Sequence, residues 1–210
     1  MIKLDVISDP ICPWCYIGKT RLDQALAARP KHPFVIEWHP FQLNPDMPRE
    51  GIDRKGYYET KFGSREAAAE TVATIMEAAK ETGLDFDLSA IPRVPNTLDA
   101  HRLILWAEVE GCQQAVVDAL FRAYFQDCRD IGDRDVLCDI ADGAGMDAAM
   151  MHRLLGGDAD LKLIVERDAA FRGMGVTGVP TFLVDRKQAV PGAQPAQLWI
   201  QVIDEIAGMA

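Results

Sequence analysis

The first forty residues carry the pattern that most limits how this chain can fold. Ile2–Ile7 alternates apolar and polar side chains and predicts a short strand. A helical stripe of apolar residues follows it and ends before Arg29 and Pro30. Pro33–Phe41, rich in β-branched and aromatic residues, predicts a second strand. A helix that joins two strands in this way makes the strands parallel, so the chain begins with a strand–helix–strand unit.

The middle of the chain has a different pattern. About a hundred residues show helical periodicity and no convincing strand. Ser64 is placed to cap one helix, and Gly83 lies just past the end of that helix. Further helices are predicted over the ranges 98–109, 116–125, 136–144 and 148–155. We therefore expect an all-helical insertion at residues 49–160.

The end of the chain returns to a mixed pattern. A helix over residues 161–171 leads to a glycine-rich stretch, a strand at Thr181–Val184 and a short partner strand at residues 188–190. The last helix, around Leu198–Ile206, has the cleanest apolar stripe. Residues 1–48 and 161–210 together predict an α/β domain, a small sheet with helices on both faces, interrupted by the helical insertion.

Charge and composition exclude several classes of partner. With 32 acidic and 22 basic residues the net charge is -10, and no block of Lys or Arg could neutralise phosphates, so neither nucleic acid nor an anionic membrane is expected as a partner. No apolar run approaches the roughly 18 residues of a membrane span. Residues 1–10 do not resemble a signal peptide, because Asp5 interrupts a short apolar stretch. We expect a cytoplasmic protein.

Two of the five cysteines lie close together, at the junction of the first strand and its helix. Cys12 is expected at or just before the helix N-terminus, where unpaired N–H groups and the helix dipole favour a thiolate. Pro13 suits the first helical turn, since its missing N–H would be unbonded there. Trp14 is expected at the surface as an apolar contact for substrate. Cys15 is close enough to attack a mixed disulfide formed at Cys12.

Three interpretations of this pair compete. Redox chemistry needs a strand, a C-x-x-C sequence and a helix, and the chain has all three. A zinc site needs a second pair of ligands, and the four histidines include no pair at metal-binding spacing, so no metal is expected. The third interpretation is that the two cysteines are unreactive structural thiols in a turn. Cys112, Cys128 and Cys138 are expected to be ordinary thiols.

A second motif lies far from the dithiol in the sequence. Val179 and Pro180 follow a glycine-rich stretch and stand directly before the strand Thr181–Val184. Most X-Pro bonds are trans, so a trans proline at the start of an edge strand is one interpretation. A tight turn that faces the helix N-terminus is the other.

Taken together, these motifs give the chain a resemblance to a known family. It resembles the DsbA-like branch of the thioredoxin superfamily, and within it the FrnE-type group related to 2-hydroxychromene-2-carboxylate isomerase. The matching pieces are residues 9–18, 40–45, 96–102, 175–182 and 192–195.

The resemblance implies a thioredoxin-like fold with a large helical insertion. It also implies that Pro180 is cis and packs beside the dithiol, and that the Val179 backbone pairs with an extended substrate or with glutathione. His101 follows the Asn96–Ala100 motif, and the family pattern puts it at a position that faces the site, although a hydrogen-bonded core histidine is the simpler interpretation.

The function expected from these features is thiol–disulfide oxidoreduction, with Cys12 and Cys15 as catalytic residues and Pro13, Trp14, Val179, Pro180 and His101 as substrate contacts. The expected substrates are protein or small-molecule disulfides, with no tightly bound cofactor and with glutathione as a candidate co-substrate. The chain is expected to be a monomer or a homodimer. The alternative is a glutathione-dependent isomerase or a kappa-type glutathione transferase, in which a Ser usually replaces the first Cys. A binding module without redox activity is a third hypothesis.

Overall fold

The computed structural model describes residues 1–208, without the side chains of residues 59 and 60. Its centre is a sheet with the strand order β2-β1-β5-β6. The strands are β1 (Ile2–Ser8), β2 (Phe34–Pro40), β5 (Thr181–Val184) and β6 (Gln188–Pro191). β1 runs parallel to β2 and antiparallel to β5, which in turn pairs antiparallel with β6. The predicted parallel pair at the start of the chain is therefore confirmed.

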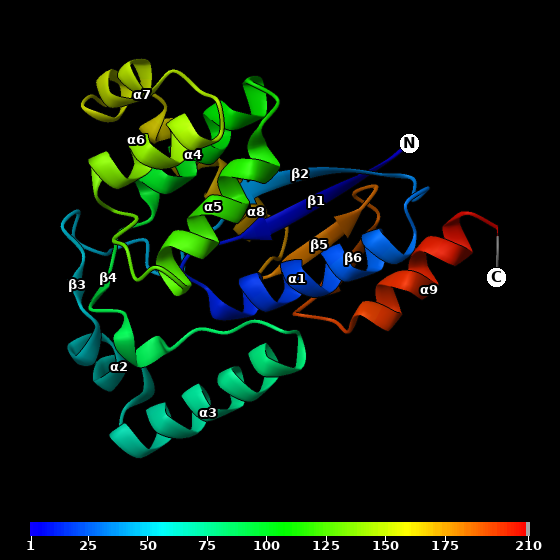
Figure 1. Cartoon of the computed structure of the whole chain (residues 1–210), viewed down its shortest axis with the longest axis horizontal. Helices are drawn as coiled ribbons and strands as arrows, with labels where there is room; N and C mark the ends of the chain where they lie inside the picture. Colours follow the sequence, from blue (N-terminus) through cyan, green and yellow to red (C-terminus); the bar gives the residue numbers. More distant parts are fainter. Residues whose placement is uncertain (209–210) are drawn as a thin grey trace.

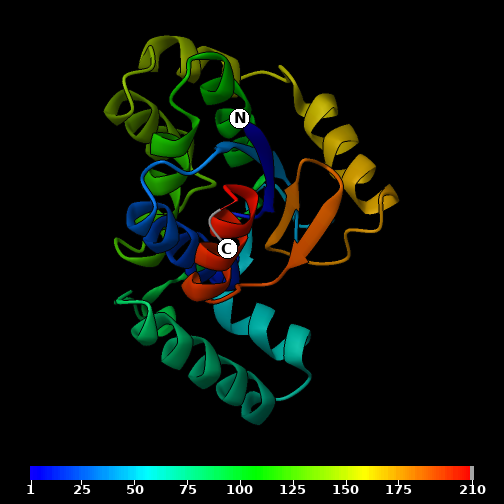
Figure 2. The same cartoon turned by 90° about the vertical axis from the view of Figure 1, so that its right-hand side faces the viewer.

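Helices cover both faces of this sheet. α1 (Pro13–Ala28) and α9 (Ala196–Ile206) lie side by side along one face (Figure 1). α8 (Leu161–Gly173) lies on the opposite side of β5 and β6 (Figure 2). The alternation of side chains along β1 explains this, because Leu4 and Val6 join the larger buried cluster while Ile7 joins a smaller one with Phe171.

The helices of the middle region pack against β2 and against α1. They are α3 (Arg65–Glu81), α4 (Leu98–Val109), α5 (Gln113–Phe125), α6 (Arg134–Gly143) and α7 (Ala148–Leu155). α4 and α5 lie on β2, and α3 lies on α1. Ser64 caps α3 by accepting the Ala67 N–H at 3.1 Å, as the sequence predicted. Gly83 follows the end of α3 with a φ of +79°, a conformation that glycine adopts without strain.

Two features of the middle region were not predicted. β3 (Ile52–Asp53) pairs antiparallel with β4 (Arg93–Val94), so the expectation of a strand-free insertion is wrong at this point. α2 (Arg54–Phe62) follows β3 directly. A pair of two-residue strands is too short to show a period of two, and its residues meet only because the chain folds back over forty residues.

The larger buried cluster does not stop at the predicted boundaries of the insertion. Cys15 and Trp38 belong to it, and so do Phe121 and Phe125 from α5. Tyr16 of α1 stacks on Phe121 with ring centroids 5.1 Å apart. One buried core thus contains residues from both predicted parts, residues 1–48 with 161–210 and residues 49–160. The division of the chain into these two domains stays a prediction.

Candidate active site

Cys12 occupies the position just before α1. It is the N-cap residue, in an extended conformation, and Pro13 begins the helix. Its carbonyl accepts the N–H groups of Cys15 at 3.0 Å and Tyr16 at 3.2 Å. Its own N–H donates to the Asp9 carbonyl at 2.9 Å, which fixes the loop ahead of the helix. Cys12 therefore lies at the N-terminus of α1, the positive end of the helix dipole.

Cys15 lies one turn further along the helix and is more deeply enclosed. It is 1% exposed, and both cysteines are free thiols in this structure. Burial raises the pKa of the Cys15 thiol well above its ordinary value, and the neighbouring Cys12 adds to this rise. The two thiols are thus chemically distinct, and Cys15 is held in its protonated form.

Val179 and Pro180 form the other side of the site. Their peptide bond is cis, as the resemblance implied. The Cys12 Sγ lies 3.7 Å from the Val179 carbonyl oxygen. The turn is closed by Thr181, whose hydroxyl donates to the Gly178 carbonyl at 2.7 Å. These contacts bring together two motifs from opposite ends of the chain.

Gly18 allows this approach. A Cβ on Gly18 would lie 3.0 Å from the Pro180 Cγ and 3.3 Å from the Ala193 Cα. The turn at Ala193 is tied to the same helix, because the Arg21 Nη1 donates to the Ala193 carbonyl at 2.7 Å. α1 and the proline turn therefore pack more closely than any side chain at position 18 would permit.

An apolar cavity of about 280 Å³ opens beside Cys12. Pro13, Trp14 and Val179 line it, and their role as substrate contacts stays a prediction. Pro180 lines a neighbouring groove with Thr181 and Gly192. The rest of the cavity wall includes four aromatic residues that the sequence did not connect with the dithiol, together with aliphatic side chains and the cation Lys61. The aromatic residues are Tyr57, Tyr58, Phe62 and Tyr124. Only Tyr124 was assigned to a predicted helix, and no periodicity linked the other three to the dithiol.

The Asp9 side chain stabilises the loop before Cys12. Its buried carboxylate accepts the Leu43 N–H at 2.7 Å and the Ile11 N–H at 3.3 Å. Burial raises the pKa of this carboxyl to about 7. These contacts make Asp9 a cap for the turn between β1 and α1.

His101 lies behind this loop rather than on the cavity wall. It is 2% exposed, and its Nε2 lies 3.9 Å from the Asp9 Oδ1. Burial lowers the pKa of its imidazole to about 4, so the ring is uncharged at neutral pH. It is not among the described residues that line the cavity at Cys12, so a direct contact with substrate has no support in this geometry.

A separate acidic group lies on the two neighbouring strands β1 and β2. Asp5, Glu37 and His39 place one ligand atom each within 4.8 Å of one another, but Arg186 donates to Asp5 at 3.0 Å and Lys3 pairs with Glu37. The His39 Nε2 donates to the Asp5 carboxylate at 2.7 Å. Arg186 and Lys3 compensate the acidic charge, so the group is an ion-pair network rather than a metal site.

Within residues 1–208, every helix is too short or too polar to cross a lipid bilayer.

The family model described as the DsbA-like thioredoxin domain matches residues 3–203. The chain belongs to this family. A crystal structure described as a probable DsbA oxidoreductase, SCO1869 from Streptomyces coelicolor, is 30% identical, with a TM-score of 0.87 over all of this chain and 92% of that one. The DsbA-like fold predicted from the sequence is therefore confirmed.

Two more distant structures share the fold of this DsbA-like protein. The cytosolic disulfide reductase DsbM from Pseudomonas aeruginosa is 20% identical, with a TM-score of 0.71 over 99% of this chain and 100% of that one, and it has also been solved with GSH. A 2-hydroxychromene-2-carboxylate isomerase is 15% identical, with a TM-score of 0.71 over 99% of each chain. At these identities the likeness concerns the fold alone.

Proposed function

We propose that this DsbA-like protein is a thiol–disulfide oxidoreductase that acts through Cys12 and Cys15 on protein or low-molecular-weight disulfides. The observation that carries the proposal is the arrangement around Cys12. Its sulfur lies at the N-terminus of α1 and 3.7 Å from the Val179 carbonyl, with the buried Cys15 one turn behind it.

The reaction has two exchange steps. The Cys12 thiolate attacks one sulfur of the substrate disulfide, forms a mixed disulfide with it, and releases the other sulfur as a thiolate. Cys15 then gives up its proton and attacks the Cys12 sulfur. The second substrate sulfur leaves as a thiol, and Cys12 and Cys15 are joined by a disulfide. The substrate disulfide has been reduced by two electrons, and the dithiol has been oxidised by two. A small-molecule thiol or dithiol returns the pair to its reduced form.

The unequal environments of the two thiols suit these roles. Cys12 faces the cavity, whereas burial keeps Cys15 protonated until a mixed disulfide brings an electrophilic sulfur next to it. Pro13, Trp14 and Val179 offer the substrate an apolar surface beside Cys12. Pro180 holds the Val179 turn against α1.

The proposal also includes a reducing compartment and a small thiol as co-substrate. DsbM is described as cytosolic and has been solved with GSH. By analogy, we propose glutathione as the small thiol and the cytoplasm as the compartment. A reducing compartment favours reductase or isomerase work over net oxidation.

The test is a dithiol-dependent disulfide reduction assay on the native protein and on Cys12→Ser, with Cys112→Ser as the matched control. Cys12→Ser should lose the activity and Cys112→Ser should keep it. Equal activity in the native protein and Cys12→Ser would refute the proposal.

A glutathione-dependent isomerase is a second candidate, favoured by the aromatic lining of the cavity beside Cys12, which suits a planar ring. The intact Cys12 speaks for redox chemistry instead. Isomerisation of 2-hydroxychromene-2-carboxylate that needs glutathione and survives Cys15→Ser would favour the isomerase.

A further inference from the structure

The cavity beside Cys12 has a cation on its wall. Lys61, in the last turn of α2, lines this cavity. No Asp or Glu is among the described residues that line it, although the chain carries 32 acidic residues against 22 basic ones. An anionic group that enters the cavity therefore meets a positive charge and no carboxylate on the described wall.

Two contacts position the Lys61 side chain. Its Nζ donates to the Tyr57 hydroxyl and lies 4.9 Å from the centroid of the Tyr57 ring, a cation–π contact. The Tyr57 hydroxyl in turn donates to the Asn44 Oδ1 at 3.0 Å. An ammonium group has three donors, so the bond to Tyr57 leaves two for a ligand. Because Lys61 is exposed, a ligand can reach them.

Asp9 is the buried carboxyl that the charge of Lys61 reaches. Burial raises the pKa of Asp9 to about 7, and Lys61 opposes this rise. Asp9 is fully buried and accepts the N–H groups of Leu43 and Ile11, and it is not among the described residues that line the cavity. A ligand anion at Lys61 therefore has no Asp9 carboxylate to displace.

The size and walls of the cavity indicate the rest of the ligand. Its volume of about 280 Å³ lies just below the range of about 300–1,000 Å³ that holds drug-sized molecules, so it fits one small group rather than a polypeptide segment. Aromatic side chains favour another ring in offset or edge-to-face contact. Five aromatic residues line the cavity: Trp14, Tyr57, Tyr58, Phe62 and Tyr124.

We propose that this cavity selects low-molecular-weight disulfides in which one sulfur carries an aromatic ring with a carboxylate, and that Lys61 binds the carboxylate. The inference rests on the proposed function, since it takes Cys12 to attack the ring-bearing sulfur. That attack forms a mixed disulfide at Cys12 and releases the other half of the substrate as a thiolate. Cys15 then displaces the ring-bearing half as a thiol. Cys12 and Lys61 line the same cavity, so one small molecule can contact both.

The reaction of the reduced protein with three disulfides, in the absence of any other thiol, tests the charge preference. Dithiobis(nitrobenzoate) has rings and carboxylates, dithiodipyridine has rings and is uncharged at neutral pH, and dithiodipropionate has carboxylates and no ring. Mass spectrometry of the peptide with Cys12 and Cys15 gives the second-order rate constant. Lys61→Gln should lower it about fivefold for the two anionic disulfides, the effect of one exposed ion pair, and leave dithiodipyridine unchanged.

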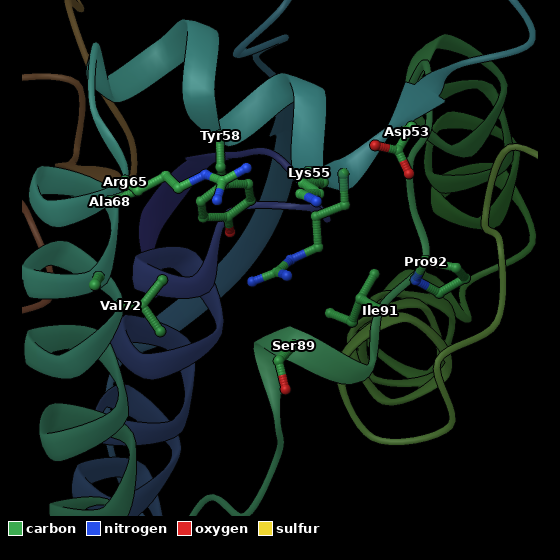
Figure 3. Close-up of a pocket in the computed structure, with 11 residues that line it drawn as sticks. Asp53, Lys55, Tyr58, Arg65, Ala68, Val72, Ser89, Ile91 and Pro92 are labelled. Atoms are coloured by element: carbon green, nitrogen blue, oxygen red, sulfur yellow. The ribbon is translucent and has the colours of Figure 1, made fainter.

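Lys55→Gln is the matched control. Lys55 is an exposed cation of the same helix, but Figure 3 shows it at a neighbouring cavity of about 560 Å³, and Cys12 is not among the described residues that line that cavity. Lys55→Gln should change none of the rate constants, whereas Lys61→Arg should keep most of the native rate. Salt at about 1 M should reduce the effect of Lys61→Gln by screening. Equal losses in Lys55→Gln and Lys61→Gln, or no loss in Lys61→Gln, would overturn the inference.

Phe62→Leu tests the preference for a ring, because it keeps an apolar side chain and removes an aromatic one. It should lower the rate constant about fivefold for the two aromatic disulfides and leave dithiodipropionate nearly unchanged. The midpoint of urea unfolding checks that the variant is folded. An equal change for all three disulfides would contradict the aromatic preference.

A binding experiment keeps this inference separate from the proposed function. Nitrobenzoate and its uncharged counterpart nitrobenzamide contain no sulfur and are titrated into Cys12→Ser, with and without Lys61→Gln. Quenching of tryptophan fluorescence measures the binding, since Trp14 lines the cavity. Weaker binding of nitrobenzoate alone after Lys61→Gln supports the site even if the native protein reduces no disulfide. Equal binding of nitrobenzoate to both proteins, or none to either, refutes it.

Discussion

The sulfur of Cys12 and the carbonyl oxygen of Val179 lie 3.7 Å apart, although 167 positions separate the two residues in the sequence. Any substrate sulfur that reaches Cys12 must therefore pass next to the main chain of Val179. The contact joins the first strand–helix connection to the turn before β5. It brings the two ends of the chain together at the candidate site.

The two thiols of the reduced protein should react in a fixed order. Cys12 lines a cavity, whereas Cys15 is 1% exposed and burial raises its pKa. Iodoacetamide should therefore modify Cys12 well ahead of Cys15, as measured by mass spectrometry of the derived peptides. Cys15→Ser should also accumulate a mixed disulfide with substrate. Faster labelling of Cys15 would contradict the proposed roles.

Gly18→Ala should disturb the contact between α1 and the proline turn. The added Cβ would meet the Pro180 Cγ at 3.0 Å, and overpacking of this kind costs about 1–3 kcal/mol, more than the helix propensity gained. We expect a lower midpoint in urea unfolding and a lower kcat. Gly143→Ala is the matched control, because it also lies in a helix with nothing within 4 Å of the new Cβ. It should be neutral or slightly stabilising, and identical behaviour of the two variants would argue against the close packing.

Asp9→Asn should change the pH dependence of stability. The pKa of Asp9 is about 7 in the folded protein, above its value in an unfolded chain, so its contribution to stability is present in acid and lost as the pH rises from about 4 to 7. The pKa of His101 is about 4, below its unfolded value, so its contribution is lost as the pH falls from about 6.5 to 4. The two effects oppose each other in the native protein between these limits.

Without the Asp9 carboxyl, only the His101 effect remains. Between about pH 6.5 and 4.5 the Asp9→Asn variant should lose about 2–3 kcal/mol more of its unfolding free energy than the native protein does. Urea unfolding at several pH values measures this difference. Asp139→Asn, at a carboxylate 69% exposed, should give a curve parallel to the native one. A parallel curve for Asp9→Asn as well would show that the two groups do not titrate as described.

Arg102→Met should destabilise the whole fold. The Arg102 side chain is fully buried and donates to the carbonyls of Ala159, Leu154 and Gly157 at 2.6–2.9 Å and to Asp99 at 2.7 Å. Its removal leaves several acceptors unpaired and should cost about 3–5 kcal/mol in the free energy of unfolding. Arg122→Met, at a side chain 72% exposed, should cost less than about 1 kcal/mol. Chemical unfolding of both variants checks the contrast, which a small loss at Arg102 would contradict.

Local signals account for the parts of the site that the sequence predicted. A cysteine pair directly after a strand and before a helix can occupy only the helix N-terminus, so Cys12, Pro13 and Cys15 could be assigned at once. The Ser64 cap and the bounds of α4 were likewise set by neighbouring residues. The cis peptide bond before Pro180 was predicted from the family resemblance, because the residues alone were also compatible with a trans proline.

The rest depended on contacts between distant segments. β3 and β4 pair two residues each, and α2 has a weak apolar pattern, so the wall made by Tyr57, Tyr58 and Phe62 left no signal in the sequence. His101 was proposed as a substrate contact because it follows a family motif. The fold instead turns it toward Asp9, behind the loop. Position along a helix does not tell which neighbour a side chain will meet.

The sequence by itself determined the chemistry available to this protein: a dithiol at a helix N-terminus, a proline turn before a strand, and a chain with too little positive charge for nucleic acid. Strand and helix periods and terminal preferences are local, so they can be deduced from neighbouring residues. Tertiary structure decided which thiol faces the cavity, what lines that cavity, and where the cations of α2 lie. Those properties depend on which surfaces exclude water from one another, and that is fixed only when segments more than a hundred residues apart pack together.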